Sequence, residues 1–586
     1  MTEMMTGAEM VVRAMQDQDV ETIFGYPGGA VLPIYDALFQ QNSIKHILVR
    51  HEQGAVHSAE GYARSCGKVG VVLVTSGPGA TNAVTGLTDA LMDSIPLVCF
   101  TGQVPTHLIG SDAFQECDTV GITRHCTKHN YLVKRIEDLP RIIHEAFYVA
   151  RTGRPGPVVI DVPKDIQFAR GVYTPPGDIQ HKSYRPKTKG DRGQIERAVE
   201  LMLRAKRPVF YTGGGVINSG PEASKTLREL VRLTGFPVTS TLMGLGSYPA
   251  NDPLWLGMLG MHGTYEANLA MHDCDVMINI GARFDDRITG RLDAFSPGSR
   301  KIHVDIDPSS INKNVKTEVG IIGDAGNVLK EMLDLFRTKK RAEQADELRP
   351  WWKSINAWRA RNSLAYKRSD TIIKPQYAIE RLYQLTKGRK TYVTTEVGQH
   401  QMWAAQHFHF DEPNRWMTSG GLGTMGYGLP AAIGVQMAHR DALVIDIAGE
   451  ASILMNMQEM STAAQYRLPV KIFILNNEYM GMVRQWQELL HGGRYSESYS
   501  EALPDFVKLA EAYHAKGIRC SDPAQLDAAI MEMIDHPGPV IFDCLVAKEE
   551  NCLPMIPSGK AHNEMILPDF VGEIGDVIDA KGKALV

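Results

Sequence analysis

The sequence predicts an α/β protein with three doubly wound parallel-sheet domains and a C-terminal tail. The first observation is an alternation in which short apolar runs such as "GVVLVTSG", "DVMINIGA" and "VKIFILNN" are each followed by a stretch of helical length. This alternation is typical of parallel sheets that are covered by helices on both faces. The second observation is the length of 586 residues, which is too great for one hydrophobic core.

Two polar joints divide the chain. The stretch "GVYTPPGDIQHKSYRPKTKGDRG" is rich in Pro, Gly and charge and is predicted to be a linker. A second joint lies near "RTKKRAEQADELRPWW", where charge density rises and the strand pattern ends. We therefore expect domains at 1–172, 190–340 and 372–545, followed by a tail or lid at 546–586.

Composition excludes several classes of protein. Hydrophobic residues make up 44% of the chain and charged residues 22%, as in ordinary globular proteins. The net charge of -5 leaves no surplus of cations for a phosphate backbone, so no nucleic-acid partner is expected. No apolar run is long enough to span a bilayer, and the N-terminus lacks the pattern of a signal or transit peptide. We expect a cytoplasmic protein without a membrane partner.

The eight cysteines form no CxxC pair, which predicts reduced and mostly buried thiols. The stretch "CDTVGITRHCTKH" places His125 and His129 at helical spacing and raises the alternative of a zinc site. Such a site needs more closely paired ligands, so packing is favoured.

In the first domain, Glu52 of "RHEQGA" stands where an apolar strand ends and a helix begins. Ligands of open parallel sheets bind at the carboxyl ends of strands, which makes Glu52 a candidate functional residue. The alternative is that an acid at this place only stabilises the N-terminus of the helix.

In the second domain, "YTGGGVINSG" suggests a nicotinamide dehydrogenase as a first hypothesis. The GxGxxG fingerprint requires a third glycine where the chain has Asn218, and no acid ends a strand about 20 residues later. A nucleotide or phosphate beside this turn remains possible, but NAD is disfavoured. No GxxxxGK[ST] motif occurs either.

In the third domain, "GEASILMN" follows the strand "ALVIDIA", and "NNEYMG" follows the strand "VKIFIL". We expect one helix over "SILMNMQEMSTAAQY" between them, and a right-handed crossover then places Glu450 beside Asn477. Carboxylate and amide oxygens suit Mg²⁺, and N–H groups at a helix start suit a diphosphate. The alternative is that these are ordinary turn residues.

The segment from "GEAS" to "NN" resembles the thiamine-diphosphate motif, in which Gly-Asp-Gly precedes a helix, a strand and Asn-Asn. Glu450 and Ala451 stand in place of the usual Asp and Gly. The chain as a whole is similar to the acetohydroxyacid (acetolactate) synthase family. The matching motifs follow in the expected order over roughly residues 10 to 560 and include "YPGGAVLPIYDAL", "RHEQGAVHSAEGYAR", "TSGPGATN", "GARFDDRITG", "GLGTMGYGLPAAIG", "MGMVRQWQ" and "LPMIPSG".

The resemblance implies an activity. Family members decarboxylate pyruvate on thiamine diphosphate and join the two-carbon unit to pyruvate or 2-ketobutyrate, in the biosynthesis of valine, leucine and isoleucine. The implied cofactors are thiamine diphosphate, Mg²⁺ and a structural FAD. The implied partners are small-molecule 2-ketoacids, a second copy in a homodimer or homotetramer, and a separate small regulatory subunit.

Other activities on the same architecture stay open. Pyruvate oxidase and sulfoacetaldehyde acetyltransferase are alternatives, as is glyoxylate carboligase, which is disfavoured because it lacks the glutamate that Glu52 supplies here. A flavin-binding scaffold without turnover is the alternative from another class.

The resemblance also assigns residues. Glu52 would hydrogen-bond the pyrimidine ring of the cofactor, Arg287 would bind the carboxylate of the second ketoacid, and Trp486 would face its alkyl group. The full set with implied catalytic or substrate roles is Gly29, Glu52, Gln115, Lys164, Arg287, Met482 and Trp486.

The implied cofactor sites are larger sets. Glu450, Asn477 and Tyr479 would bind the metal. Thiamine diphosphate and its metal would contact Pro78, Asn82, Val397, Gly398, Gln399, His400, Gly423, Met425, Gly449, Glu450, Ala451, Ser452, Asn477, Tyr479, Met480 and Gly481. FAD would contact Arg154, Gly213, Gly214, Gly215, Thr241, Leu242, Met261, His262, Gly281, Arg283, Asp285, Asp305 and Asp324.

Overall fold

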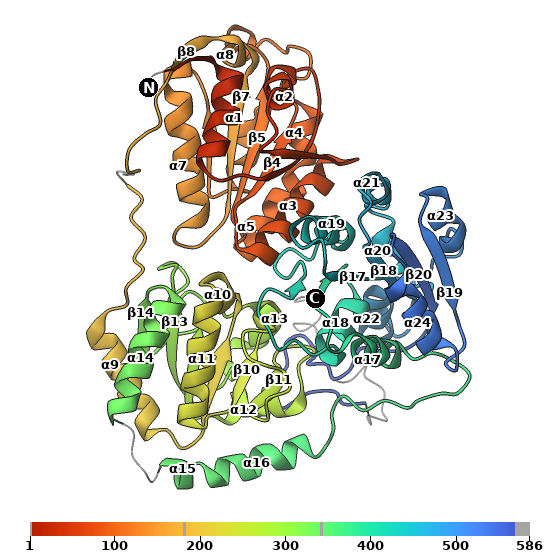
Figure 1. The fold of residues 1–586 in the computed structure, drawn as a ribbon. Helices are drawn as coiled ribbons and strands as arrows, with labels where there is room; N and C mark the ends of the chain where they lie inside the picture. Colours follow the sequence, from red (N-terminus) through yellow and green to blue (C-terminus); the bar gives the residue numbers. More distant parts are fainter. Residues whose placement is uncertain (1–2, 180–182, 340–343, 569–586) are drawn as a thin grey trace.

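The computed structural model describes residues 3–179, 183–339 and 344–568 and contains three six-stranded parallel sheets (Figure 1). The sheets succeed one another along the chain, and each carries helices packed on its faces. The predicted fold class, three α/β domains with parallel sheets, is therefore confirmed.

The first sheet has the strand order β3-β2-β4-β5-β7-β6. Its central strands are buried along their whole length, which explains why they are continuous apolar runs. The strands are β2 (Thr22–Tyr26), β3 (Lys45–Leu48), β4 (Gly70–Val74), β5 (Leu97–Gln103), β6 (His129–Leu132) and β7 (Pro157–Pro163). The helices are α1 (Gly7–Asp17), α2 (Leu32–Phe39), α3 (Glu52–Cys66), α4 (Pro78–Asn82), α5 (Val84–Asp93), α6 (Thr119–Thr123), α7 (Leu139–Arg151) and α8 (Lys164–Phe168).

The second sheet has the order β11-β10-β9-β12-β13-β14. Its strands are β9 (Pro208–Thr212), β10 (Val238–Ser240), β11 (Trp255–Met258), β12 (Val276–Ile280), β13 (Arg300–Asp305) and β14 (Val319–Ile322). Its helices are α9 (Arg192–Arg204), α10 (Gly214–Asn218), α11 (Pro221–Thr234), α12 (Tyr265–Asp273), α13 (Asp286–Thr289) and α14 (Ala325–Lys339). Helices α15 (Gln344–Glu347) and α16 (Arg349–Arg359) follow it.

The third sheet has the order β16-β15-β17-β18-β20-β19. Its strands are β15 (Thr391–Thr395), β16 (Trp416–Met417), β17 (Leu443–Ala448), β18 (Lys471–Asn476), β19 (Lys516–Cys520) and β20 (Val540–Leu545). Its helices are α17 (Pro375–Thr386), α18 (Gln399–His407), α19 (Gly428–Ala438), α20 (Glu450–Ile453), α21 (Glu459–Gln465), α22 (Gly481–His491), α23 (Phe506–Ala512) and α24 (Leu526–Asp535).

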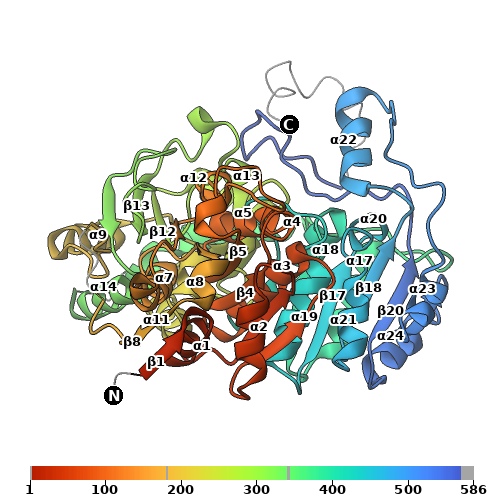
Figure 2. The same cartoon turned by 90° about the horizontal axis from the view of Figure 1, so that it is seen from above.

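Helices α3 and α19 join the first and third domains, and Figure 2 shows them between strands β4 and β17. Their backbones touch at two glycines. A Cβ atom on Gly61 would collide with the carbonyl of Ala431, and one on Gly434 would collide with the carbonyl of Ser58. Only glycine allows the two helices to pack at this distance.

The structure corrects the prediction for the crossover between β17 and β18. One continuous helix was expected there, but α20 ends at Ile453 and α21 begins at Glu459. Between them, Asn456 Nδ2 donates a hydrogen bond to the Gly426 carbonyl at 2.7 Å. This bond anchors the segment between α20 and α21 to the backbone of another part of the third domain.

A short antiparallel pair, β1 (Glu3–Thr6) with β8 (Arg170–Tyr173), completes the first domain. The described part of the tail crosses from the third domain to the second. There the Ile556 N–H donates to the Met261 carbonyl at 2.8 Å, and His562 Nε2 lies 2.6 Å from the Ile288 carbonyl. Among the described residues, no helix combines the length and the apolar character required to cross a bilayer.

Candidate active site

The first-domain residues that the resemblance assigns to catalysis or to thiamine diphosphate gather at one edge of its sheet. Each of them follows the carboxyl end of a strand: Gly29 follows β2, Glu52 follows β3, Pro78 and Asn82 follow β4, Gln115 follows β5 and Lys164 follows β7. Glu52 is the first residue of α3, where the helix dipole favours an acid. It is also buried, and its Oε2 accepts a hydrogen bond from Asn82 Nδ2 at 2.9 Å. The helix dipole explains an acid at this position, but it does not explain the hydrogen bond from Asn82.

A carboxylate from the third domain holds the backbone just before Glu52. Glu459 Oε1 accepts hydrogen bonds from the N–H groups of Arg50 at 2.9 Å and His51 at 3.0 Å. Its Oε2 accepts from the Thr462 hydroxyl at 2.7 Å. Burial raises the pKa of Glu459 to about 7. The entry into α3 is therefore fixed across the domain boundary.

Glu450 and Asn477 lie at the ends of neighbouring strands, because β17 pairs in parallel with β18. Glu450 begins α20, and Asn477 directly follows β18. Burial raises the pKa of Glu450 to about 8, opposed by its own backbone N–H and that of Asn477, which favour the charged form. Glu450 Oε1 is buried and has no hydrogen-bond partner among the described residues. A cation at this place would satisfy that oxygen.

The diphosphate candidates surround this acid. Burial lowers the pKa of His400 to about 3, so its imidazole is neutral, and Nε2 has no partner among the residues described. A Cβ atom on Gly449 would lie 2.8 Å from His400 Nδ1, and one on Gly481 would collide with Gln399 Oε1. Glycines therefore keep the backbone of both turns close to polar side chains, as a phosphate cradle requires.

The turn at 423–426 lies next to these residues in the third domain. Gly423 and Gly426 both have positive φ angles, 76° and 91°. Met425 lies between them and is partly buried. Two left-handed glycines so close together bend the backbone sharply around this methionine.

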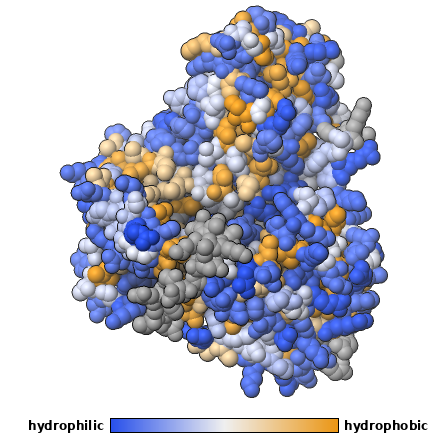
Figure 3. Space-filling view, turned by 180° about the vertical axis from the view of Figure 1, so that it is seen from behind, coloured by the Kyte–Doolittle hydropathy of each residue, from blue (hydrophilic) through white to orange (hydrophobic). Residues whose placement is uncertain are grey.

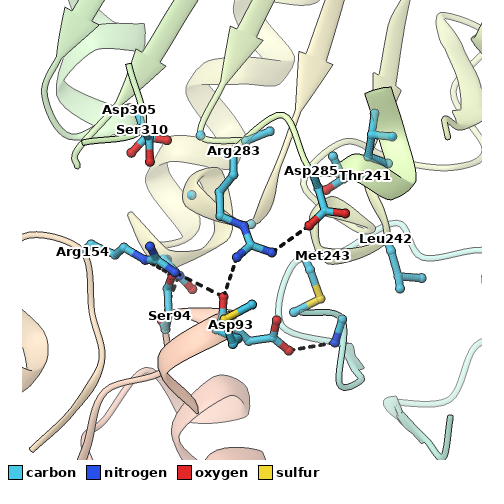
Figure 4. A pocket seen from close by; sticks show the side chains of 18 of the residues that line it. Asp93, Ser94, Arg154, Thr241, Leu242, Met243, Arg283, Asp285, Asp305 and Ser310 are labelled. Carbon is cyan, nitrogen blue, oxygen red and sulfur yellow. Dashed lines mark hydrogen bonds and ion pairs between the residues drawn. The ribbon is translucent and has the colours of Figure 1, made fainter. Parts of the chain in front are cut away.

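A cavity of about 750 Å³ lies between the three domains (Figure 4). Twelve of the thirteen residues predicted for FAD line it: Arg154, Gly214, Gly215, Thr241, Leu242, Met261, His262, Gly281, Arg283, Asp285, Asp305 and Asp324. The exception is Gly213, where a Cβ atom would collide with the carbonyl of Gly281. Gly213 therefore allows the ends of β9 and β12 to pack closely.

The same cavity extends to the third domain, where Val397, Gly423, Met482 and Trp486 line it together with Arg287. The guanidinium of Arg287 lies over the indole of Trp486, 5.8 Å from the ring centre. The cavity thus places a cation and an apolar ring side by side, a pair that suits a small carboxylate with an alkyl group.

The chain is similar to known thiamine pyrophosphate enzymes along most of its length. Models of thiamine pyrophosphate enzymes match residues 5–122 (N-terminal TPP binding domain), 195–332 (central domain) and 396–544 (C-terminal TPP binding domain). The acetolactate synthase large subunit of Haemophilus influenzae is 51% identical, covering 96% of this chain and 98% of that protein. The isozyme 3 large subunit of Escherichia coli is 52% identical over 96% of this chain and 99% of its own length. The chain belongs to the acetolactate synthase large-subunit family.

The family extends to plants, because a chloroplastic acetolactate synthase of Arabidopsis thaliana is 47% identical over 96% of this chain and 84% of its own length. As a member of the acetolactate synthase family, this chain carries all three thiamine pyrophosphate enzyme domains. The resemblance inferred from the motifs is thereby confirmed.

In one chain of this acetolactate synthase family member, the predicted site residues do not all lie in the same cavity. Val397, Gly423, Arg287, Met482 and Trp486 share the large cavity. None of the first-domain candidates for catalysis or thiamine diphosphate lines that cavity, which the FAD candidate Arg154 does line: Gly29, Glu52, Pro78, Asn82, Gln115 and Lys164 all lie outside it. The two sets of residues therefore occupy separate parts of one chain.

Sequence reasoning missed one group of residues in this acetolactate synthase family member. Met92, Asp93 and Ser94, at the C-terminal end of α5, line the cavity. Figure 4 shows Arg154 and Arg283 directed at this helix end, where Arg283 Nη1 donates to the Met92 carbonyl at 3.2 Å. The stretch "LMDS" contains no glycine turn or motif, so no sequence signal indicated its position.

Proposed function

We propose that this chain is the catalytic subunit of an acetolactate synthase, which decarboxylates pyruvate and joins the two-carbon unit to pyruvate or 2-ketobutyrate. This reaction belongs to the biosynthesis of valine, leucine and isoleucine. Family membership supports the assignment, and the pairing of Arg287 with Trp486 in the cavity is the observation that carries it. The guanidinium provides two donors for a carboxylate, and the indole face receives the methyl or ethyl group.

Thiamine diphosphate supplies, when bound, the carbon that adds to the ketoacid and the electron sink for decarboxylation. The chain would hold it through Val397, His400, Gly423 and Gly449. Glu52 would exchange a proton with the pyrimidine ring, and Asn82 holds the Glu52 carboxylate in place through their 2.9 Å bond. Burial of the acid keeps water away from this proton.

A magnesium ion fits the site at Glu450. The donors would be the unpartnered Glu450 oxygen, the Asn477 side-chain oxygen and the Tyr479 backbone carbonyl, which are the oxygen ligands that Mg²⁺ prefers. FAD fits the part of the cavity that Arg154 and Arg283 enter, and there it would have a structural role, because the net reaction transfers no electrons.

We propose a homodimer or homotetramer in which the active site is completed by a second copy. Hydrophobic side chains are exposed in the first domain (Tyr26, Leu32, Phe114, Ile122) and in the third (Leu422, Met455, Val483). Figure 3 shows hydrophobic surface gathered on the lobe of the first domain. Such exposure supports coverage by a partner.

The relatives named as large subunits support a separate small regulatory subunit as a further partner. We also propose a cytoplasmic location, which is supported by the eight cysteines, all of which are free.

The test is anaerobic incubation of the purified protein with pyruvate, Mg²⁺, thiamine diphosphate and FAD, with and without 2-ketobutyrate. Release of CO₂ and formation of acetolactate without an electron acceptor is the expected result, and it distinguishes this enzyme from a pyruvate oxidase. Absence of CO₂ release would overturn the proposal. Glu52→Gln serves as the control for non-enzymatic decarboxylation.

A further inference from the structure

The turn that begins at Ser419 is held from the first domain. The Ser419 hydroxyl donates a hydrogen bond to Asp89 Oδ1 at 2.9 Å. The same hydroxyl oxygen accepts from the N–H groups of Gly423 at 3.0 Å and Thr424 at 2.8 Å. A serine hydroxyl has one donor and two acceptor positions, so the bonding capacity of Ser419 is fully used.

Asp89 determines the direction of this hydroxyl. By accepting the single proton of Ser419, the carboxylate leaves both lone pairs free to face the turn. Asp89 is 0% exposed and Ser419 is 1% exposed, so solvent does not replace a lost partner. Removing the carboxylate would free the hydroxyl to rotate and leave buried N–H groups poorly paired.

A second carboxylate on the same face of α5 holds the start of the turn. Asp93 Oδ2 accepts from the Gly420 N–H at 2.8 Å, and its Oδ1 accepts from the Gly421 N–H at 2.7 Å. Asp89 and Asp93 are one helical turn apart and therefore lie on one side of α5. Together they contact the backbone of the turn at four N–H groups, two directly and two through Ser419.

We propose that Asp89, acting through Ser419, is a positioning residue for the turn at 419–424 and hence for the Gly423 carbonyl at the cofactor. This inference rests on the proposed function, in which Gly423 is one of the residues that would hold thiamine diphosphate. Asp89 is fully buried and is not among the residues that line the large cavity. Its effect on the reaction passes through one hydroxyl.

The surroundings of Asp89 provide a matched control. Glu60 lies in the same buried cluster, where its Oε1 is 2.9 Å from His57 Nδ1, and His57 Nδ1 is 3.8 Å from Asp89 Oδ2. Among the residues that the structure describes, Glu60 makes no hydrogen bond to the turn. Glu60→Gln therefore perturbs the cluster without removing a bond to Ser419.

The experiment compares wild type, Asp89→Ala, Asp89→Asn, Ser419→Ala, the double variant Asp89→Ala/Ser419→Ala and Glu60→Gln, each as full-length protein. Two quantities are measured for each protein: the Kd for thiamine diphosphate with Mg²⁺, from quenching of tryptophan fluorescence, and the rate of hydrogen–deuterium exchange at C2 of the bound cofactor. Thermal melting checks the fold. Asp89→Ser replaces Asp89→Ala if the latter does not fold, because serine is too short to reach Ser419.

We expect Asp89→Ala and Ser419→Ala each to slow C2 exchange about tenfold or more, since a displacement of about 1 Å costs up to about 100-fold. Asp89→Asn keeps an acceptor oxygen and should restore most of the rate, and Glu60→Gln should match wild type. The double variant should be no slower than Ser419→Ala, because both changes break one path.

If wild type binds the cofactor, two results would overturn the inference. One is an unchanged rate of C2 exchange in Asp89→Ala, and the other is additive effects of the two changes in the double variant. A wild-type protein that binds no thiamine diphosphate would overturn the proposed function and this inference together.

Discussion

The guanidinium of Arg287 lies 5.8 Å from the ring centre of Trp486, and the two side chains come from different domains. Arg287 belongs to α13 of the second domain, and Trp486 belongs to α22 of the third. The proposed site for the second ketoacid is therefore assembled between domains, and its charge and its apolar surface can be changed separately.

Replacing Trp486 by Leu should lower the preference for 2-ketobutyrate over pyruvate as second substrate. The indole offers a larger apolar face for the extra methyl group, which is worth about 1–3 kcal/mol in a hydrophobic pocket. Competition between the two ketoacids gives the ratio of products. His491→Ala, at the exposed end of the same helix, is the control and should leave the ratio unchanged. An unaltered ratio in Trp486→Leu would assign the preference to another side chain.

Replacing Glu52 by Gln should leave the fold intact and slow exchange of the C2 proton of bound thiamine diphosphate by ~10²–10⁴-fold, the usual contribution of a general acid or base. The amide keeps the size of the side chain and its contact with Asn82. Exchange is followed by acid quenching and NMR of the released cofactor. A rate equal to that of wild type would remove Glu52 from proton transfer.

Replacing Glu450 by Gln should raise the Mg²⁺ concentration for half-maximal activity about 10–100-fold, because a charged contact worth about 1.5–3 kcal/mol is lost. Glu450→Asp should remain active but require more Mg²⁺, since its shorter side chain sets the oxygen back. Titration of activity with Mg²⁺ and with thiamine diphosphate measures both. If Glu450 only favours the N-terminus of α20, worth about 0.3–1 kcal/mol, Glu450→Gln will titrate like wild type.

The buried acid Glu459 should make the free energy of unfolding of this protein depend on pH. Its pKa rises from 4.5 to about 7 on folding, because burial disfavours the charge. The folded state then holds more protons than the unfolded state between these values, so the contribution of Glu459 to stability falls as pH rises through this window. Glutamine resembles the protonated acid and can still accept from Arg50 and His51. Glu459→Gln should therefore gain stability relative to wild type, by at most about 1.4 kcal/mol per pH unit.

Thermal melting of both proteins at several pH values between 4.5 and 7 measures this difference. The control is Glu137→Gln, whose side chain is exposed and whose variant should melt in parallel with wild type. If the difference in stability between Glu459→Gln and wild type stayed constant over this pH range, Glu459 would be charged in the folded protein.

Strand-exit reasoning predicted a large part of the site from the sequence. Glu52, Glu450 and Asn477 each follow an apolar run, and parallel strands that carry such runs end at a common edge. The adjacency of Glu450 and Asn477 follows from a right-handed crossover and needs no structure. Their assignment to a metal and a cofactor stays a prediction.

The remainder depends on contacts between domains, which leave no local pattern. Asp89, Asp93 and Ser419 are ordinary helix or turn residues until α5 packs against the third domain. The break in the crossover helix has the same origin, since Asn456 bonds to Gly426 from another segment. Periodicity reports which face of an element is buried, but it does not report which element covers that face.

The glycine contact between α3 and α19 restricts where this molecule can open. Gly61 and Gly434 set each helix backbone against a carbonyl of the other, so neither helix can slide without collision. The first and third domains accordingly form one packed frame along these two helices. The second domain meets this frame at the large cavity, through side chains such as Arg283. Any relative motion of the first and third domains must therefore separate α3 from α19, because sliding one helix along the other would drive backbone into backbone.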